Sequence, residues 1–454
     1  MAANRSVLAR IRLNMDRTGH RLTVALTALP LTLATPMLVT SSSAGAPATP
    51  AAEPTAWFAK GVLTVRGTKK GDTITLARQG KRVAVRVGSR KVALPKGYTN
   101  RRTDEIRVIG LAGNDTMTVD SSKGRLPDVV LVGGKGDDTL TGGARSDVLE
   151  GYQGDDVLRP GAGGRDVLDG GIGADTYLVD ADLAGQATIV EPDADGPDHL
   201  SFAGTSRAVT ISLGSKTSQP VSSAYAVVLP QLGIEELTGG DGADTLRGGD
   251  TGNRIHGGAG NDVLAPNLGM GSMTDGDNVL AGDAGDDTYE LFLSCGVCSA
   301  TRLEDTAGSD TLSLVGGLGA NLRLDTTAWQ DIAPNSRLQL GSLSAIDNVI
   351  GGGTDDISGN DLPNRLNGWY GDDTLTGKGG ADTFVVGGPY PGLGSWGADS
   401  VTDFAGGIDL VDLDPGLSVK SGLGTSTVTI WDGTTDLGSI TASNGHLWTG
   451  ADFT

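Results

Sequence analysis

The chain has few of the residues from which a conventional globular core and most catalytic sites are built. Of its 454 residues, 4% are aromatic, two are cysteine and four are histidine. So little aromatic surface excludes one large core of the usual kind, because aromatic side chains contribute much of the area that such cores bury. Beyond residue 39, no stretch approaches the roughly 18 consecutive apolar residues that a membrane-spanning helix needs.

Glycine and acidic residues, by contrast, are abundant. The chain has 72 glycines, about twice the usual share, which implies either disorder or a repeat that uses glycine at fixed positions. The net charge is −20, but residues 57–128 hold 16 Lys/Arg against 6 Asp/Glu, whereas residues 129–454 hold 14 against 47. An acidic excess of this size repels itself unless cations lie within it, and it excludes nucleic acid as a partner.

The N-terminal residues have the composition of an export signal. Arg17 and Arg21 precede an apolar-rich stretch over residues 22–39, and small residues follow at 41–46. This order predicts a secretion signal over residues 1–44, an extracellular protein and no membrane span after signal removal. An uncleaved anchor is the alternative, but the prolines and threonines within the apolar stretch disfavour it.

A nine-residue repeat organises much of the acidic region. GGKGDDTLT (133–141) and GYQGDDVLR (151–159) show its form, with glycine at positions 1 and 4, aspartate at position 6 and an apolar residue at position 8. The repeat recurs in three blocks, 129–180, 238–290 and 348–386. A flexible Gly/Asp linker would not place an apolar residue two positions after the aspartate in twelve of thirteen repeats, so the pattern indicates a fold.

The blocks end alike, and the segments between them resemble each other. Tyr177, Tyr289 and Phe384 stand where the other repeats mostly carry Leu or Ile, and we expect these larger side chains to plug the open ends of a solenoid. The sequence therefore divides into a secretion signal (1–44), a linker (45–56), a basic β-rich module (57–128), block one (129–180), a β-rich spacer (181–237), block two (238–290), a second β-rich spacer (291–347), block three (348–386) and a C-terminal β cap (387–454).

The repeat has the chemistry of a calcium site. Calcium takes six to eight oxygen ligands, from carboxylates and carbonyls, at about 2.3–2.6 Å. Glycine lets turn carbonyls point inward, and the position-6 aspartate supplies a carboxylate. The predicted ligands of several calcium ions are the position-6 residues Asp138, Asp147, Asp156, Asp166, Asp175, Asp244, Asn253, Asp262, Asp287, Asp356, Asn364, Asp373 and Asp382. The two asparagines depart from the pattern, and block three starts one residue short, which weakens Asp356.

The nine-residue pattern matches a known calcium-binding nonapeptide repeat, and this match implies an all-β fold of calcium-loaded parallel β-roll (β-solenoid) blocks joined by β-rich spacers. Two turn-strand units make one coil, so like positions stack about 18 residues apart. Asp138 and Asp156 obey this spacing, as do Asp244 and Asp262, and Pro160 lengthens the neighbouring intervals by one. The predicted interior residues are Leu140, Leu149, Leu158, Leu168, Tyr177, Leu246, Ile255, Leu264, Tyr289, Leu366, Leu375 and Phe384. Because this core is thin, we expect the blocks to fold only when calcium binds.

Residues 133–178, 239–290 and 351–385 closely resemble the hemolysin-type calcium-binding (RTX) repeat family. The resemblance implies calcium-loaded parallel β-rolls. Residues 399–413 are similar to the segment that follows the last roll in serralysin-like C-terminal regions, which implies a capping role for Asp399, Asp403 and Asp409. The chain departs from Gram-negative relatives in its N-terminal leader and in the lack of an attached enzyme.

No recognised catalytic motif occurs, so the chain is predicted not to be an enzyme. Neither H-E-x-x-H nor G-x-S-x-G is present, and His199, His256 and His446 are isolated in the sequence. Cys295 and Cys298 lie in a spacer without the βαβ pattern of a redox motif, and no further zinc ligands are evident. In an exported protein a local disulfide is the favoured interpretation over free thiols.

The function is predicted to be calcium-dependent and structural or adhesive. The basic module could be a solvated sheet face, or it could bind cell-wall polymer or another anionic extracellular polymer at the cell surface. Two alternatives stay open: a secreted hydrolase with an unrecognised site in a spacer, and an extracellular calcium buffer.

Overall fold

The computed structural model describes residues 53–454 except 96–102, 192–195, 232, 250–251, 267–277, 294–299, 306, 388–396 and 434. The predicted secretion signal and the predicted disulfide between Cys295 and Cys298 lie outside the described residues. Within them, the predicted all-β fold is confirmed: strands form four sheets, and the one helix is a short 3-10 turn, Gly450–Asp452. The described chain thus offers no helix of the length and apolarity that crossing a membrane requires.

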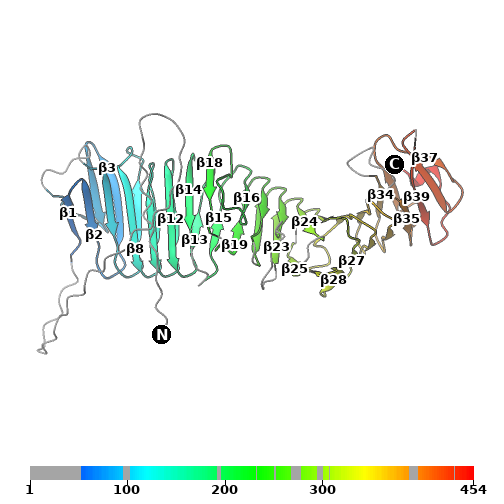
Figure 1. Cartoon of the computed structure of the whole chain (residues 1–454), viewed down its shortest axis with the longest axis horizontal. Helices are drawn as coiled ribbons and strands as arrows, with labels where there is room; N and C mark the ends of the chain where they lie inside the picture. The colour runs from blue at the N-terminus through cyan, green and yellow to red at the C-terminus, as the bar shows by residue number, and fades with distance from the viewer. Residues whose placement is uncertain are drawn as a thin grey trace, which may run out of the picture. The chain divides into compact units, whose positions relative to one another are not determined.

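Two of the sheets face each other in the N-terminal half, and the chain alternates between them. Most neighbouring strands in both sheets are parallel (Figure 1). Sheet A contains, in spatial order, β1 (Thr55–Ala59), β2 (Val62–Arg66), β6 (Glu105–Ile109), β8 (Asp128–Lys135), β10 (Val148–Gln153), β12 (Arg165–Ile172), β14 (Gly185–Val190), β18 (Tyr225–Val228) and β17 (Gln219–Pro220). Sheet B contains β5 (Arg90–Lys91), β4 (Arg82–Val87), β3 (Thr73–Gln79), β7 (Thr116–Asp120), β9 (Thr139–Thr141), β11 (Val157–Arg159), β13 (Thr176–Leu178), β15 (His199–Ser201), β19 (Glu236–Thr238), β21 (Arg254–Ala259), β23 (Asn278–Ala284), β25 (Ala300–Leu303), β29 (Ser336–Leu340) and β28 (Gln330–Ala333).

Two further sheets build the later part of the chain in the same way. Sheet C contains β16 (Thr210–Ser212), β20 (Thr245–Arg247), β22 (Val263–Ala265), β24 (Thr288–Phe292), β26 (Thr311–Val315), β30 (Asn348–Ile350), β32 (Arg365–Asn367), β34 (Thr383–Val386) and β36 (Leu410–Leu413). Sheet D contains β27 (Asn321–Arg323), β31 (Asp356–Ser358), β33 (Thr374–Thr376), β35 (Gly397–Val401), β39 (Asp436–Ala442), β38 (Thr427–Trp431) and β37 (Ser418–Ser421).

The register of the strands stacks like positions of the repeat. Leu149 of β10 pairs with Leu131 on one side and with Leu168 on the other. Side chains alternate between the two faces of a strand, so the middle residue of each three-residue strand points inward. All twelve predicted interior residues are at most 2% exposed, which confirms the predicted core. That core extends through the basic module and the spacers, because Val65, Phe202 and Tyr225 are buried as well.

Each spacer exchanges one sheet for another. In the first spacer, β15 and β19 continue sheet B, the antiparallel hairpin β17–β18 ends sheet A, and β16 begins sheet C. In the second spacer, β26 continues sheet C, the antiparallel hairpin β28–β29 ends sheet B, and β27 begins sheet D. The spacers are therefore coils in hydrogen-bonding continuity with the repeats, which the sequence pattern did not reveal.

The prediction that Tyr177, Tyr289 and Phe384 plug the open ends of a solenoid is wrong. Tyr177 pairs with Leu158 on one side and with Leu200 of the spacer on the other. Tyr289 lies in the same way between Leu264 and Leu312. Phe384 pairs with Leu366 on one side and with Val411 of β36 on the other. All three side chains lie inside a continuing stack, because the strand that follows each block adds to the same sheet.

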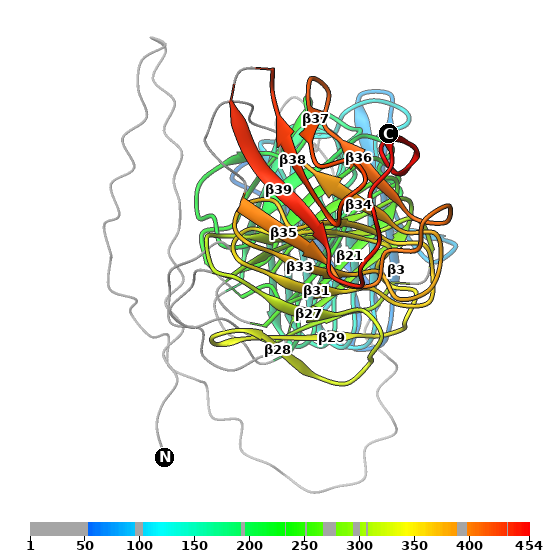
Figure 2. The same ribbon diagram turned by 90° about the vertical axis from the view of Figure 1, so that its right-hand side faces the viewer.

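Hairpins and a C-terminal cap close most of the outer sheet edges. The antiparallel pairs β1–β2 and β3–β4–β5 cover the N-terminal edges of sheets A and B. At the other end, sheet D passes from parallel β35–β39 into antiparallel β39–β38–β37 (Figure 2). Sheet C ends at β36, where Val411 forms a single bridge to Phe453. The outermost strands β5 and β17 have two residues each, so they offer little unpaired backbone to other chains.

Trp448 is the centre of the C-terminal cap. Its side chain is 0% exposed, and its ring lies 4.6 Å from that of Phe404 and 5.6 Å from that of Phe453. Replacing Trp448 by Ala is expected to destabilise the calcium-loaded chain by about 3–5 kcal/mol through the cavity left behind. Urea unfolding followed by circular dichroism measures this, with Leu447→Ala as a neighbouring control because Leu447 is 56% exposed. Equal effects of the two substitutions would refute the capping role.

Candidate calcium site

Position-6 aspartates of successive coils form hydrogen-bonded ladders. The backbone N–H of Asp138 donates to Oδ1 of Asp156 at 2.6 Å, and the N–H of Asp156 donates to Oδ1 of Asp175 at 2.7 Å. The same bond links Asp147 to Asp166, Asp244 to Asp262, Asp262 to Asp287, Asp355 to Asp373, and Asn364 to Asp382. Each of these side chains therefore accepts a hydrogen bond from the turn one coil before it. The spacing is 18 or 19 residues, as predicted, except between Asp262 and Asp287, which are 25 residues apart.

The ladder turns fall into two kinds, according to the second carboxylate oxygen. In closed turns that oxygen, or the single amide oxygen of Asn, accepts an N–H from its own turn, as Oδ2 of Asp147 does from Gly143 at 2.6 Å. In open turns Oδ2 is buried and has no hydrogen-bond partner. The closed turns end at Asp147, Asp244, Asn253, Asp355, Asn364 and Asp409. The open turns end at Asp115, Asp138, Asp156, Asp166, Asp262, Asp287, Asp310 and Asp373.

In every open turn, a glycine with positive φ stands two residues before the aspartate. In the turn of Asp156 this residue is Gly154, with a φ of 126°, and a Cβ on it would collide with the carbonyl oxygen of Gly136 in the preceding coil. Glycine is needed here because its backbone reaches positive φ without strain and leaves room for that carbonyl. The residue at this place has no such φ in the closed turns of Asp147 and Asp244, whereas Gly407 in the closed turn of Asp409 has a φ of 81°. In the turn of Asp156 the backbone thus lies directly against a turn carbonyl of the preceding coil.

Burial makes the charged form of the open-turn carboxylates costly. It raises the pKa of Asp156, Asp166 and Asp373 to about 8, and that of Asp115 and Asp262 to about 7. The N–H donor on Oδ1 partly offsets this cost. Neighbouring ladder carboxylates add to it by repulsion. A carboxylate in this position needs either a proton or a cation.

The donor set of the open turns fits calcium. Each offers a buried carboxylate oxygen without a hydrogen-bond partner, and stacked turn carbonyls lie beside it. Calcium prefers carboxylate and carbonyl oxygens, and it tolerates irregular arrangements of six to eight of them. When bound, the ion would supply the positive charge that the ladder lacks. The closed turns, whose oxygens already accept N–H groups, have less need of one.

The structure places the predicted ligands in three settings. Asp138, Asp156, Asp166, Asp262, Asp287 and Asp373 end open turns. Asp147, Asp244, Asn253 and Asn364 end closed turns, and both predicted asparagines fall in this class. Asp175 and Asp382 are buried ladder residues, whose Oδ1 atoms accept from Asp156 and Asn364.

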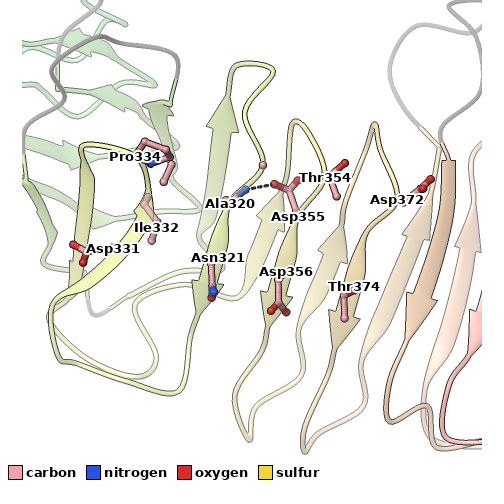
Figure 3. Close-up of a pocket in the computed structure, with 12 residues that line it drawn as sticks. Ala320, Asn321, Asp331, Ile332, Pro334, Thr354, Asp355, Asp356, Asp372 and Thr374 are labelled. Atoms are coloured by element: carbon pink, nitrogen blue, oxygen red, sulfur yellow. Dashed lines mark hydrogen bonds between the residues drawn. The ribbon is translucent and has the colours of Figure 1, made fainter.

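Asp356, the remaining predicted ligand, is not part of a ladder. Its side chain is exposed at the start of β31, whereas Asp355 is 3% exposed and accepts the N–H of Ala320 at 2.6 Å (Figure 3). Figure 3 also shows a pocket beside the two residues, and the described residues that line it include no histidine or cysteine. The prediction was displaced by one residue because block three starts one residue short. Ile357, two residues after Asp355, restores the apolar position that Asp356 lacked.

A pair of substitutions distinguishes these two aspartates. Asp355→Ala is expected to destabilise the calcium-loaded chain by about 1–3 kcal/mol, because it leaves the buried N–H of Ala320 without an acceptor. Asp356→Ala is expected to change stability by no more than about 0.5 kcal/mol, as for most exposed positions. Urea midpoints in saturating calcium measure both variants, and a larger loss for Asp356→Ala would refute the assignment.

Several ladder residues were not among the predicted ligands. They share the order Asp–x–apolar but lie outside a complete glycine frame, so the nine-residue pattern passed over them. The missed residues are Asp72, Asp115, Asp198, Asp310, Asp399 and Asp409. The last two had been assigned only to the cap. A search for Asp–x–apolar at intervals of about 18 to 27 residues would have found most of them.

Fold and site together define a parallel β-roll with calcium-binding turns. A family model described as RTX calcium-binding nonapeptide repeat (4 copies) matches residues 132–163, 161–182, 232–269, 274–290 and 349–384. The chain therefore belongs, through these repeats, to the RTX calcium-binding repeat family, and it is a calcium-binding protein of that family. No curated protein matches it.

Proposed function

We propose that this is a secreted structural or adhesive protein that folds when it meets extracellular calcium. The observation that carries the proposal is the set of buried open-turn carboxylate oxygens without hydrogen-bond partners. A ladder of such groups is unstable when charged and empty of cations, and stable when calcium neutralises it. A chain of this kind stays unfolded where calcium is scarce and folds where calcium is plentiful, which suits export.

Calcium titration of the chain without residues 1–44 tests the proposal. Far-UV circular dichroism is expected to show a transition from coil to β-sheet with calcium and none with magnesium at equal concentration. The transition is expected to be weakened or lost in Asp138→Ala/Asp156→Ala, which removes two adjacent open-turn carboxylates. A spectrum that is rich in β-sheet without calcium and insensitive to it would refute the proposal.

The proposal assigns the protein no catalytic activity and places its partners among anionic extracellular polymers. Lys81, Arg82, Arg86, Arg90 and Lys91 are exposed on the β4–β5 edge of sheet B, where charged side chains also serve to block edge pairing. Binding of the calcium-loaded chain to cell walls or to a soluble polyanion, competed by salt, would support the adhesive role. Failure to bind any of these in the presence of calcium would leave edge protection as the role of these residues.

A further inference from the structure

Two groups of three buried carboxylates lie where blocks one and two meet their spacers. The first consists of Asp175, Glu191 and Asp198, and the second of Asp287, Asp305 and Asp310. In each group the ligand oxygens all lie within 4.8 Å of one another. Two members of each group are consecutive ladder residues, one in the block and one in the spacer. The third, Glu191 or Asp305, lies in the spacer outside the ladder.

A tyrosine hydroxyl holds the spacer carboxylate of each group. Tyr177 donates to Oε2 of Glu191 at 2.6 Å and accepts the backbone N–H of Gly170 at 2.9 Å. Oε1 of Glu191 is buried and has no hydrogen-bond partner, and Glu191 is 3% exposed. The tyrosine thus satisfies one carboxylate oxygen and leaves the other free to bind a cation.

The second group repeats this arrangement with different residues. Tyr289 donates to Asp305 and accepts the N–H of Gly282 at 2.7 Å. The Oδ2 atoms of Asp287 and Asp310, both 1% exposed, have no hydrogen-bond partner. The same constellation is therefore built twice, from two spacers whose acidic residues differ.

Block three provides an internal comparison. Phe384 replaces the tyrosine and has no hydroxyl, and Asp403 accepts the N–H groups of Gly377 and Lys378 directly, at 2.9 and 2.7 Å. Both oxygens of Asp403 are thereby used. Among the described residues, no third group of three close carboxylates forms there. In blocks one and two, where a group of three is present, a tyrosine hydroxyl accepts the hydrogen bond from the glycine N–H. In block three, where the described residues form no such group, an aspartate accepts it.

We propose that these two groups are three-carboxylate calcium sites that fill before the open turns elsewhere on the ladders. The inference rests on the calcium binding proposed above and adds to it a distinct class of site. Two oxygens on one calcium ion lie up to about 5 Å apart, against about 4.2 Å for magnesium, so a spread of 4.8 Å accommodates calcium better. A third charged ligand raises calcium affinity. Each ion would tie a spacer to the block before it.

Terbium luminescence of the purified chain in calcium-free buffer tests the inference, because Tb³⁺ replaces Ca²⁺ and is sensitised by a nearby phenol. Tyr177 and Tyr289 contact the groups directly. The first two equivalents of Tb³⁺ are expected to give most of the tyrosine-sensitised emission. Glu191→Gln/Asp305→Asn is expected to weaken this binding about tenfold or more, while saturating calcium still restores its β-sheet spectrum. Glu191→Asp, which gives the first group the composition of the second, and the block-three control Asp403→Asn are expected to retain the emission.

Emission that rises evenly with every equivalent, or that the double variant leaves unchanged, would overturn the inference. The stoichiometry of the unsubstituted chain is informative even if the double variant does not fold. The two proposals fail separately. A calcium-induced β-sheet transition without the early emission contradicts only the three-carboxylate sites, whereas a chain with no such transition contradicts the proposed function as well.

Discussion

In calcium-free buffer the repeat blocks are expected to be more stable at about pH 5 than at about pH 8. Burial raises the pKa of Asp156, Asp166 and Asp373 to about 8 in the folded chain, against about 3.9 in an unfolded one. The folded state therefore binds these protons more tightly. The stability that protonation contributes is fully present below about pH 4 and is lost as the pH rises through about 8.

Saturating calcium is expected to reverse this order. Calcium binds the deprotonated carboxylates, so protons compete with it, and the loaded chain becomes less stable on acidification over the same pH range. The β-sheet signal in far-UV circular dichroism at the two pH values measures the calcium-free trend, and urea midpoints measure the trend in saturating calcium. A calcium-free β-sheet signal that rises with pH would show that the ladder carboxylates are already neutralised by other groups.

Asp156→Asn is expected to change stability in opposite directions with and without calcium. Asp156 lies between Asp138 and Asp175 in the ladder, and the repulsion of both raises its pKa further after burial. Asparagine keeps an oxygen that can accept the N–H of Asp138 but removes the charge. Without calcium at about pH 8 the variant is therefore expected to be more stable than the unsubstituted chain. With calcium it is expected to be less stable and to bind the ion about tenfold more weakly.

Asp147→Asn is the matched control. Asp147 is as buried as Asp156, but its Oδ2 already accepts the N–H of Gly143. Asn253 and Asn364 occur naturally in the same closed setting. We expect this substitution to alter calcium affinity little. Equal losses of affinity in the two variants, measured by calcium titration, would remove the distinction between open and closed turns.

Much of the fold could be predicted because the repeat encodes it locally. Glycine at fixed places, an aspartate and an inward apolar residue such as Leu140 specify one turn and one short strand. Stacking then follows from the spacing. The exchange of sheets at the spacers could not be predicted, because it depends on which earlier strand a segment pairs with. His199 pairs with Thr176 and Glu236, a choice that alternation along the spacer does not encode.

The site was predictable in kind but not in extent. The position-6 rule identified most ladder residues, yet it could not separate open from closed turns. That distinction lies in whether the second carboxylate oxygen accepts an N–H from its own turn, and the amino acid two before the aspartate does not encode it: Gly154 precedes an open turn and Gly242 a closed one. The spacer carboxylates Glu191 and Asp305 were missed because they lie outside the nine-residue frame and are held beside the ladder by hydrogen bonds from tyrosine hydroxyls.

The exchange of sheets has a mechanical consequence. Sheet B runs through blocks one and two, and sheet C runs through blocks two and three, so one sheet stays intact wherever another stops. The ends of the sheets are therefore staggered along the chain, and no block boundary interrupts all the sheets at once. A tensile load on the two ends would meet no seam at the block boundaries. The three blocks would then unfold cooperatively under force and not one after another as independent domains.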